Sequence, residues 1–509
     1  MTDERFAAAA KAETSSADNV VGKGRPVWNN YAIQFMYPPV FRFPHIPCYR
    51  RYRYTAVDEN GKAHVFEADS SASDLSPVWA DVPEGVVRLT VNGVDDDGKV
   101  GETVGVRTFF RLSPFTSDLA PAKRSYTDAA KAAFRHVLRQ PYIRHWLTDG
   151  TPDPDYDLYV YPSKMISSII EAMIFCARTS PENADEAMRI AKNAADYLIS
   201  VTPKSGAMKD VPPTFKTDFR PDDEKNCNYT ADDRINWVMM LYPTHVGHAY
   251  AELYKATGDD KYLAEAEKIG RHYEANVLTN GSWHLIKDIR TGEVLSDAYC
   301  SPLERIVPFL MSLFEITGDE KWKSLADGGI AFVEKNELAA YEWGGQFEDS
   351  VCSENYSNLS HYGPSSLIRH YAEYCPDDAE KMAVAEDLMR FVEDQFVVWR
   401  RPAPWNKDSS DTSAFRTPCG LEQYNWYVPI DASTASVALT FFAMYKAGRG
   451  EIYLEKAKAL ADSITNAQRD DGLIPTHWMT REMTDLPFWI NCMLESAACL
   501  AFLGEALKD

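Results

Sequence analysis

The stretches AELYKATGDDKYLAEAEKI (251–269), SLFEITGDEKWKSLADGGI (312–330) and AMYKAGRGEIYLEKAKALA (443–461) are three copies of one pattern. Each copy has an apolar helix end, a turn centred on glycine, an aromatic residue and a second helix that opens with leucine and alanine at matched spacing. Glycine supplies the left-handed residue that ends a helix, and aspartate or proline after it starts the next one. The repeated unit is therefore predicted to be a helical hairpin with a short turn.

Two looser copies, at 174–194 and 368–388, extend the repeat along the chain. The connections between hairpins are long, so short and long links alternate. Six such hairpins can close into a ring that buries the apolar face of every helix, with all long connections on one rim. We predict inner helices near 162–177, 237–256, 301–316, 364–374, 431–447 and 486–504, outer helices near 182–200, 260–274, 320–335, 377–396 and 451–467, and a helix at about 126–146 that pairs with the last inner helix.

The segment before the ring has a different pattern. Runs at 52–57 and 64–68 flank Asp58-Glu59-Asn60-Gly61, which is a hairpin signal. Several short strands in this segment predict a small antiparallel β-sandwich of immunoglobulin or fibronectin type. We interpret its aromatic residues as a docking surface for the helical part, with a sugar-binding face as the alternative; they are Tyr31, Phe35, Tyr37, Phe41 and Phe43. The predicted organisation is a mobile leader at 1–26, the β-sandwich at 27–113, a linker at 114–124 and an (α/α)6 toroid at 125–509.

The repeat resembles the six-hairpin glycosidase superfamily and the related toroidal polysaccharide lyases. The resemblance rests on the six hairpins, the repeated TGDxKY/W turn and the β domain, and it covers roughly 125–509. The segment at 242–266 is similar to helical hairpins of unsaturated uronyl hydrolases. The resemblance specifies the architecture and not the reaction, and it implies a carbohydrate cleft at the rim where the inner helices begin.

Composition narrows the possible partners. The chain has 509 residues, 45% of them hydrophobic, and a formal net charge of −22. This charge, without a basic stripe, argues against nucleic acid or an anionic membrane as the main partner. Nine cysteines without CxxC spacing favour reduced thiols. No signal peptide or membrane-spanning run is recognised, so a cytoplasmic location is expected, or secretion if a signal segment is missing.

The stretch WGGQFEDSVCSENYSNLSHY (343–362) is the richest of the predicted rim loops. It holds three carboxylates, an imidazole, two phenols and three carboxamides without helical or strand periodicity. Long loops in compact domains are usually functional or disordered, and the aromatic content argues against disorder. Across the rim, the residues predicted to bind sugar are Asn228, Arg234, Tyr299, Glu304, Arg305, Trp343, Gln346, Asn355, Tyr424, Trp426, His477 and Trp478.

Glycoside hydrolysis is the first predicted reaction, on a short oligosaccharide that could contain uronic acid. It requires two carboxyl groups, about 5–5.5 Å apart for retention or about 6.5–9.5 Å for inversion. The candidates are Glu348, Asp349 and Glu354 on one loop and Asp233 on another, although Asp233 also suits a helix cap. Adjacent residues in an extended loop point apart, so one of Glu348 and Asp349 should face the cleft while the other anchors the loop.

Three alternatives remain open. A β-eliminating lyase for uronic acid linkages would use Tyr356 and His361, with Asn355 and with Arg234 or Arg305 neutralising the substrate carboxylate. A sugar epimerase would use His245 and His248, which also suit packed core positions. A sugar-binding protein without catalysis is the third alternative.

Four cysteines fall one to a predicted rim loop: Cys227, Cys300, Cys352 and Cys419. Four thiolates could converge on zinc. Buried thiols that fill gaps are commoner, and the paired-cysteine motif of toroidal arabinofuranosidases is absent. We therefore predict neither a metal nor a cofactor.

Overall fold

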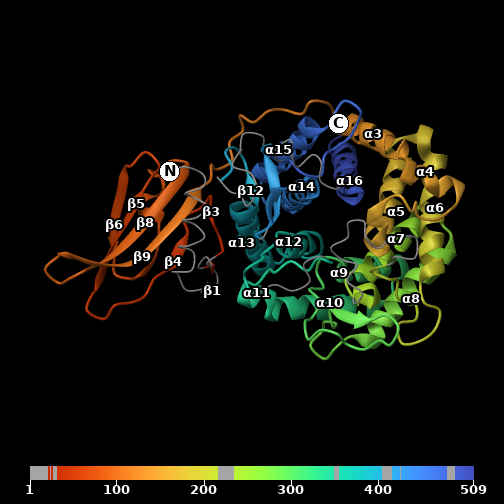
Figure 1. Ribbon diagram of the computed structural model, residues 1–509, viewed down its shortest axis with the longest axis horizontal. Helices are drawn as coiled ribbons and strands as arrows, with labels where there is room; N and C mark the ends of the chain where they lie inside the picture. Colours follow the sequence, from red (N-terminus) through yellow and green to blue (C-terminus); the bar gives the residue numbers. More distant parts are fainter. Residues whose placement is uncertain are drawn as a thin grey trace.

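The computed structural model describes residues 21–22, 25–26, 31–215, 234–348, 355–403, 415–424, 426–478 and 488–508. A β domain near the N-terminus lies beside a larger body of helices (Figure 1). The prediction of a mainly helical chain is confirmed.

The β domain is built on a five-stranded sheet with the order β3-β9-β8-β5-β6, and β4 pairs separately with β7. Alternate side chains of β5 point inward, so Tyr52 and Tyr54 are buried. Phe41 of β4 packs against Phe109 of β9, with ring centroids 5.6 Å apart. The strands are β3 (Gln34–Phe35), β4 (Val40–Arg42), β5 (Arg51–Val57), β6 (Ala63–Ala68), β7 (Ala72–Asp74), β8 (Gly85–Val94) and β9 (Val100–Arg111).

The predicted hairpin is present as β5 and β6, which pair antiparallel across the turn at 58–61. The expectation of a wholly antiparallel domain is wrong at one edge, because β3 pairs parallel with β9. These two strands are separated by most of the domain in sequence, so no tight hairpin fixes their relative direction. The immunoglobulin or fibronectin type stays a prediction.

Twelve of the described helices form six hairpins. The inner helices are α5 (Pro162–Thr179), α7 (Tyr242–Thr257), α9 (Ile306–Thr317), α12 (Tyr362–Tyr374), α14 (Asp431–Lys446) and α16 (Ile490–Leu507). Their outer partners, in the same order, are α6 (Ala184–Val201), α8 (Asp260–Asn276), α10 (Glu320–Lys335), α13 (Ala379–Phe396), α15 (Glu451–Ala467) and α3 (Tyr126–Leu138).

The inner helices follow one another around a ring (Figure 1). The last of them, α16, packs against α14 on one side and α5 on the other, and α3 covers it from outside. The first and last helices of the ring therefore meet, as the repeat predicts. One pair of neighbours differs from the rest, because α9 and α12 barely touch.

The repeated turn has the expected chemistry. α7 ends at Gly258 and α9 at Gly318, with φ of 68° and 67° in the left-handed region. Asp259 and Asp319 then cap the next helices, each accepting a hydrogen bond from the backbone N–H two residues on. These turns all lie at the ends of the inner helices, and we call this side of the ring the turn face.

Helix starts on the opposite, rim side differ from the prediction. The inner helices expected at 237 and 301 begin at Tyr242 and Ile306. Residues 237–239 form β10 (Trp237–Met239), which pairs with β11 (Ile286–Asp288) and so cannot be helical. The helix expected at 126–146 is two helices, because Pro141 starts the separate helix α4 (Pro141–Thr148).

The β domain is attached to the end of α13. Asp394 Oδ1 accepts hydrogen bonds from the backbone N–H groups of Met36 (2.6 Å) and Tyr37 (2.7 Å). Gln34 and Gln395 exchange two bonds between side-chain amides and backbone carbonyls. The Tyr37 hydroxyl donates to Glu393 at 2.9 Å, so this member of the expected aromatic docking surface is confirmed. Phe35 and Phe41 are instead buried and pack on Phe109 of β9, inside the β domain.

One described helix, α16, is long and apolar enough to cross a membrane by length and composition alone. It is mostly buried in the structure, packed between α14 and α5. Its place at the core of the ring accounts for its composition.

Candidate active site in the lumen of the ring

The first halves of the inner helices carry polar side chains that meet inside the ring. We call this region the lumen and define it by Lys164, Glu171, Tyr242, His245, His248, Glu304, Arg305, Glu348, Arg369 and Glu495. They come from four inner helices and two connections. Residues that are far apart in the sequence therefore act on one another electrostatically.

Glu348 is held at the mouth of the lumen. Its side chain is 1% exposed, Lys164 Nζ lies 2.5 Å from Oε1, and the Tyr242 hydroxyl donates to Oε2. Burial by itself raises the pKa of Glu348, but the Lys164 ammonium and these hydrogen bonds outweigh burial and leave that pKa below its usual value. Glu348 is therefore ionised and fixed in place.

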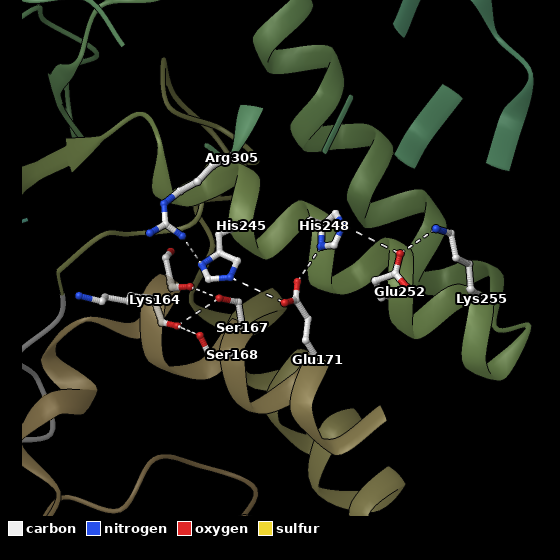
Figure 2. A network of polar contacts seen from close by, with 10 residues as sticks. Lys164, Ser167, Ser168, Glu171, His245, His248, Glu252, Lys255 and Arg305 are labelled. Carbon is white, nitrogen blue, oxygen red and sulfur yellow. Dashed lines mark hydrogen bonds and ion pairs between the residues drawn. The ribbon is translucent and has the colours of Figure 1, made fainter. Parts of the chain in front are cut away.

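Arg305 connects this mouth to a pair of histidines (Figure 2). Its guanidinium lies over the Tyr242 ring, 4.8 Å from the centroid, and Nη1 donates to His245 Nδ1 at 2.9 Å. A guanidinium can only donate, so Nδ1 accepts and the proton of the neutral imidazole is on Nε2. Burial, and then the charge of Arg305, holds the pKa of His245 well below its usual value.

The two histidines share one carboxylate. His248 Nδ1 lies 2.7 Å from Glu171 Oε1, and His245 Nε2 lies 3.9 Å from Glu171 Oε2. Burial lowers the pKa of His248, but the Glu171 carboxylate outweighs burial and the net shift is upward. The neutral His245 and the readily protonated His248 thus have different proton affinities on either side of Glu171.

Glu495 of α16 lies within reach of the charges of Arg305 and Lys164. Its side chain is exposed to solvent, yet surrounding protein raises its pKa by burial, against the lowering effect of Arg305 and Lys164. A group that water reaches although protein surrounds it lines an internal hollow. Glu304 behaves similarly, since it is half-buried and burial raises its pKa despite Arg305 and Arg369.

Arg369 of α12 lies deeper in the ring. Its guanidinium donates to neutral oxygens of Ser366, Ser436 and Thr440. No ion pair to Arg369 is found among the residues that the structure describes. The carboxylates of Glu495 and Glu304 act on it from a distance.

Of the residues predicted to bind sugar, Glu304 and Arg305 line the lumen. Trp343, Tyr424 and Trp478 are instead at least 96% buried and pack in the core, so their rings are not free to stack on a sugar. Gln346 braces two rim connections by bonding Ser301 N–H and the Tyr299 carbonyl, both at 2.8 Å. Of the others, three have described side chains: Tyr299 and Asn355 are exposed, and His477 is half-buried.

The structure does not bring the two lyase candidates together. The Tyr356 hydroxyl donates to the Ala340 carbonyl at 2.9 Å, within its own connection. His361 is fully buried against Tyr362 and Phe396, its ring nitrogens have no hydrogen-bond partner among the described residues, and burial lowers its pKa to about 3.

Several predicted residues lie outside the described part of the chain: Asn228, Asp233, Asp349 and Glu354. The side chains of Arg234 and Trp426 are likewise not described. Their predicted roles stay predictions. Within the described ranges, no group of three His, Cys, Asp or Glu side chains is arranged to hold a metal ion.

Sequence reasoning missed Lys164, Glu171, Tyr242, Arg369 and Glu495. Their position in the sequence could have revealed them, because each is a polar residue on a predicted inner helix. Glu495 is the only charged residue between positions 490 and 504 of an apolar helix. Such an isolated charge must pair, protonate or reach water.

The overall structure is similar to several solved carbohydrate enzymes. A family 76 glycoside hydrolase from a bovine Bacteroides thetaiotaomicron strain matches with a TM-score of 0.51 and 10% identity, over 92% of this chain and 96% of that one. A cellobiose 2-epimerase from Spirochaeta thermophila gives 0.53 and 12%, over 75% and 97%. A D-mannose isomerase gives 0.51 and 12%, over 74% and 97%.

At these identities the similarity concerns the fold. It confirms the resemblance to six-hairpin toroids and does not single out one family. No protein-family description and no curated protein sequence matches the chain.

Proposed function

We propose that the protein is a carbohydrate-active enzyme that hydrolyses glycosidic bonds of short oligosaccharides in the lumen. The observation that carries this proposal is Glu495, a carboxyl group that water can reach and whose pKa is raised by burial. A glycosidase acid must be protonated near neutral pH so that it can give its proton to the leaving oxygen. Glu495 has the environment that this role requires.

Hydrolysis also requires a second carboxylate. Glu348 has the charge but not the access, because Lys164 and Tyr242 hold it and only 1% of its side chain is exposed. We assign it the anchoring role that the sequence predicts for one member of the pair 348–349. Asp349 is then the proposed base or nucleophile, with Glu354 and Asp233 as the other candidates from the sequence.

Arg305, Arg369 and Glu304 supply the polar contacts of the proposed sugar site. Guanidinium groups donate hydrogen bonds to sugar hydroxyls, and carboxylates accept hydrogen bonds from them. An arginine without an ion pair can also bind a carboxylate of the substrate. This composition is compatible with neutral sugars and with uronic acids. The structural similarity to a family 76 glycoside hydrolase supports the proposal at the level of the fold.

A second candidate is epimerisation or isomerisation next to a sugar carbonyl. It is favoured by the shared carboxylate of His245 and His248, which orients two imidazoles of different pKa (Figure 2). One imidazole could remove a proton from carbon and another group return it. The lyase alternative loses support, because Tyr356 and His361 do not meet.

The cytoplasmic location stays a prediction.

One experiment separates these reactions. The protein is incubated with neutral, uronic and unsaturated oligosaccharides in parallel samples containing ¹⁸O-water and deuterium oxide. Hydrolysis gives new reducing ends that carry one ¹⁸O, epimerisation gives deuterium on the carbon next to the carbonyl, and elimination gives the ultraviolet absorbance of a conjugated uronate. The proposal requires the first result, and deuterium incorporation without cleavage would replace it with the second candidate.

A further inference from the structure

A cavity of about 280 Å³ lies between α7, α9 and α12. Lys255, Glu315 and Tyr374 line it from the last turns of these three helices, so it opens on the turn face. It occupies the gap where α9 and α12 barely touch. We call it the turn-face cavity.

The turn-face cavity is separate from the proposed hydrolytic groups. Glu495, Glu348 and Arg305 do not line it. His248 and Arg369 of the lumen also line it, so the two regions adjoin at these residues.

The charges around the turn-face cavity nearly cancel. Lys255 Nζ lies 2.7 Å from Glu252 and 3.9 Å from Glu315, so one ammonium is shared by two carboxylates. Burial and the charge of Glu315 raise the pKa of Glu373, whose charge also acts on Arg369. The lining carboxyl groups of Glu315 and Glu373 would repel an anion drawn to Arg369, whereas hydroxyl groups would find both donors and acceptors.

The shape of the lining points to the same chemistry. One wall is apolar and comes from α9, through Val307, Pro308 and Met311, while most of the polar groups come from α7 and α12. A pyranose has an apolar C–H face and a polar rim of hydroxyls. The volume is at the lower limit of small-molecule pockets, about 300 Å³, which suits a ligand of monosaccharide size.

From these observations we propose that the turn-face cavity is a second binding site, and that its ligand is a neutral monosaccharide. The site does not depend on hydrolysis in the lumen. It is linked to the lumen, however, because His248 lines the turn-face cavity and bonds Glu171 at 2.7 Å, while Glu171 lies 3.9 Å from His245 (Figure 2). A sugar bound here therefore contacts the same polar chain that reaches Arg305.

Binding is tested by NMR on isotope-labelled full-length protein. Neutral hexoses, glucuronate and glucosamine are titrated in separate samples, and the imidazole resonances of His248 are followed. Pro308→Phe fills the cavity from an exposed position, and Glu373→Gln removes one polar contact. Glu320→Gln, exposed at the start of α10, is the surface control, and Glu495→Gln reports on the lumen. Circular dichroism checks the fold of each variant.

We expect saturable binding of a neutral hexose that shifts the His248 resonances. It should persist in Glu320→Gln and Glu495→Gln, weaken about tenfold in Glu373→Gln and disappear in Pro308→Phe. The proposal is overturned if no neutral hexose binds at millimolar concentration, if Pro308→Phe binds as well as the wild type, or if Glu495→Gln abolishes binding. Tighter binding of glucuronate or glucosamine would overturn the choice of a neutral ligand.

Discussion

At the scale of single residues, the account depends on how the lumen changes the proton affinity of carboxyl groups. Glu348 and Glu495 are both glutamates in the same ring, yet the pKa of the first is lowered and that of the second is raised. The difference comes from their contacts, since Glu348 has an ammonium at 2.5 Å and Glu495 has no direct ion pair among the described residues. Of the two, only Glu495 has the raised pKa and the solvent access that a general acid needs, while Glu348 has the anchoring role.

Replacing Glu495 by glutamine should abolish most of the activity. An amide cannot protonate the leaving oxygen, so kcat should fall by about 10²- to 10⁴-fold while substrate binding is retained. The substitution Glu505→Gln is the control, because Glu505 is on the same helix but is exposed and paired with Arg178. Equal activity of the two variants would contradict the role of Glu495.

The same residue predicts the form of the pH profile. A general acid acts while it is protonated, and a raised pKa keeps Glu495 protonated to a higher pH than a free glutamate. Activity should therefore be present below this raised pKa and be lost as the pH rises through it. The residual activity of Glu495→Gln, measured over the same range, should lack this alkaline limb.

Removing the ammonium of Lys164 should destabilise the fold. The variant Lys164→Met leaves the buried Glu348 without its ion pair, which we expect to cost about 3 kcal/mol in the free energy of unfolding measured with denaturant. The double variant Lys164→Met with Glu348→Gln should recover part of the loss. Lys123→Met, whose ion pair with Asp470 is exposed, should change stability by less than about 1 kcal/mol.

The residues of the site were only partly predictable. The polar run at 343–362 placed Glu348 among the candidate residues, and Arg305 was expected at a rim. Glu495 was missed because it is an isolated charge in an apolar helix, and Lys164 and Glu171 because they are widely spaced charges in another apolar helix. The sequence shows how far apart such charges are along a helix, but not which side of the helix faces the inside of the ring. A charged residue that lines the lumen therefore looks the same in the sequence as one that is paired in the core.

At the scale of elements, the repeated turn explains why the helices form hairpins. The glycine at its centre has a positive φ, and the aspartate that follows caps the next helix. These local signals were readable in the sequence. The helix starts on the rim were not, because β10 is formed through pairing with β11, far along the chain.

Two glycine substitutions should have opposite effects on stability. Gly258→Ala places a side chain at φ of 68° with no steric clash, so only the backbone cost of about 1–2 kcal/mol should appear. Gly328→Ala lies inside α10 with open space around it and should stabilise the protein by about 0.5–1 kcal/mol. Thermal and denaturant unfolding of both variants measure the change in the free energy of unfolding. Destabilisation by Gly328→Ala would contradict the assignment of the two backbone environments.

At the scale of the whole molecule, ring closure brings α16 next to α5 and the β domain is held at the end of α13. The ring was predictable because its hairpins repeat in the sequence. The attachment of the β domain was predictable only in outline, since it depends on Asp394 and Gln395, which sequence alone places in an outer helix.

The attachment predicts how the two parts unfold. Asp394→Ala would leave the buried backbone N–H of Met36 and that of Tyr37 without their acceptor, at about 1–3 kcal/mol each. We expect calorimetry to show one transition for the wild type and two for this variant. A single, unshifted transition in the variant would show that the contact does not couple the parts.

The central claim is that the lumen holds the sugar during the reaction. A crystal structure of Glu495→Gln with the oligosaccharide that the wild type cleaves tests it most directly. The account predicts a glycosidic oxygen within hydrogen-bond distance of residue 495 and sugar hydroxyls on Arg305 and Glu304. A substrate bound on the β domain or on the outer surface of the ring, with the lumen empty, would contradict it.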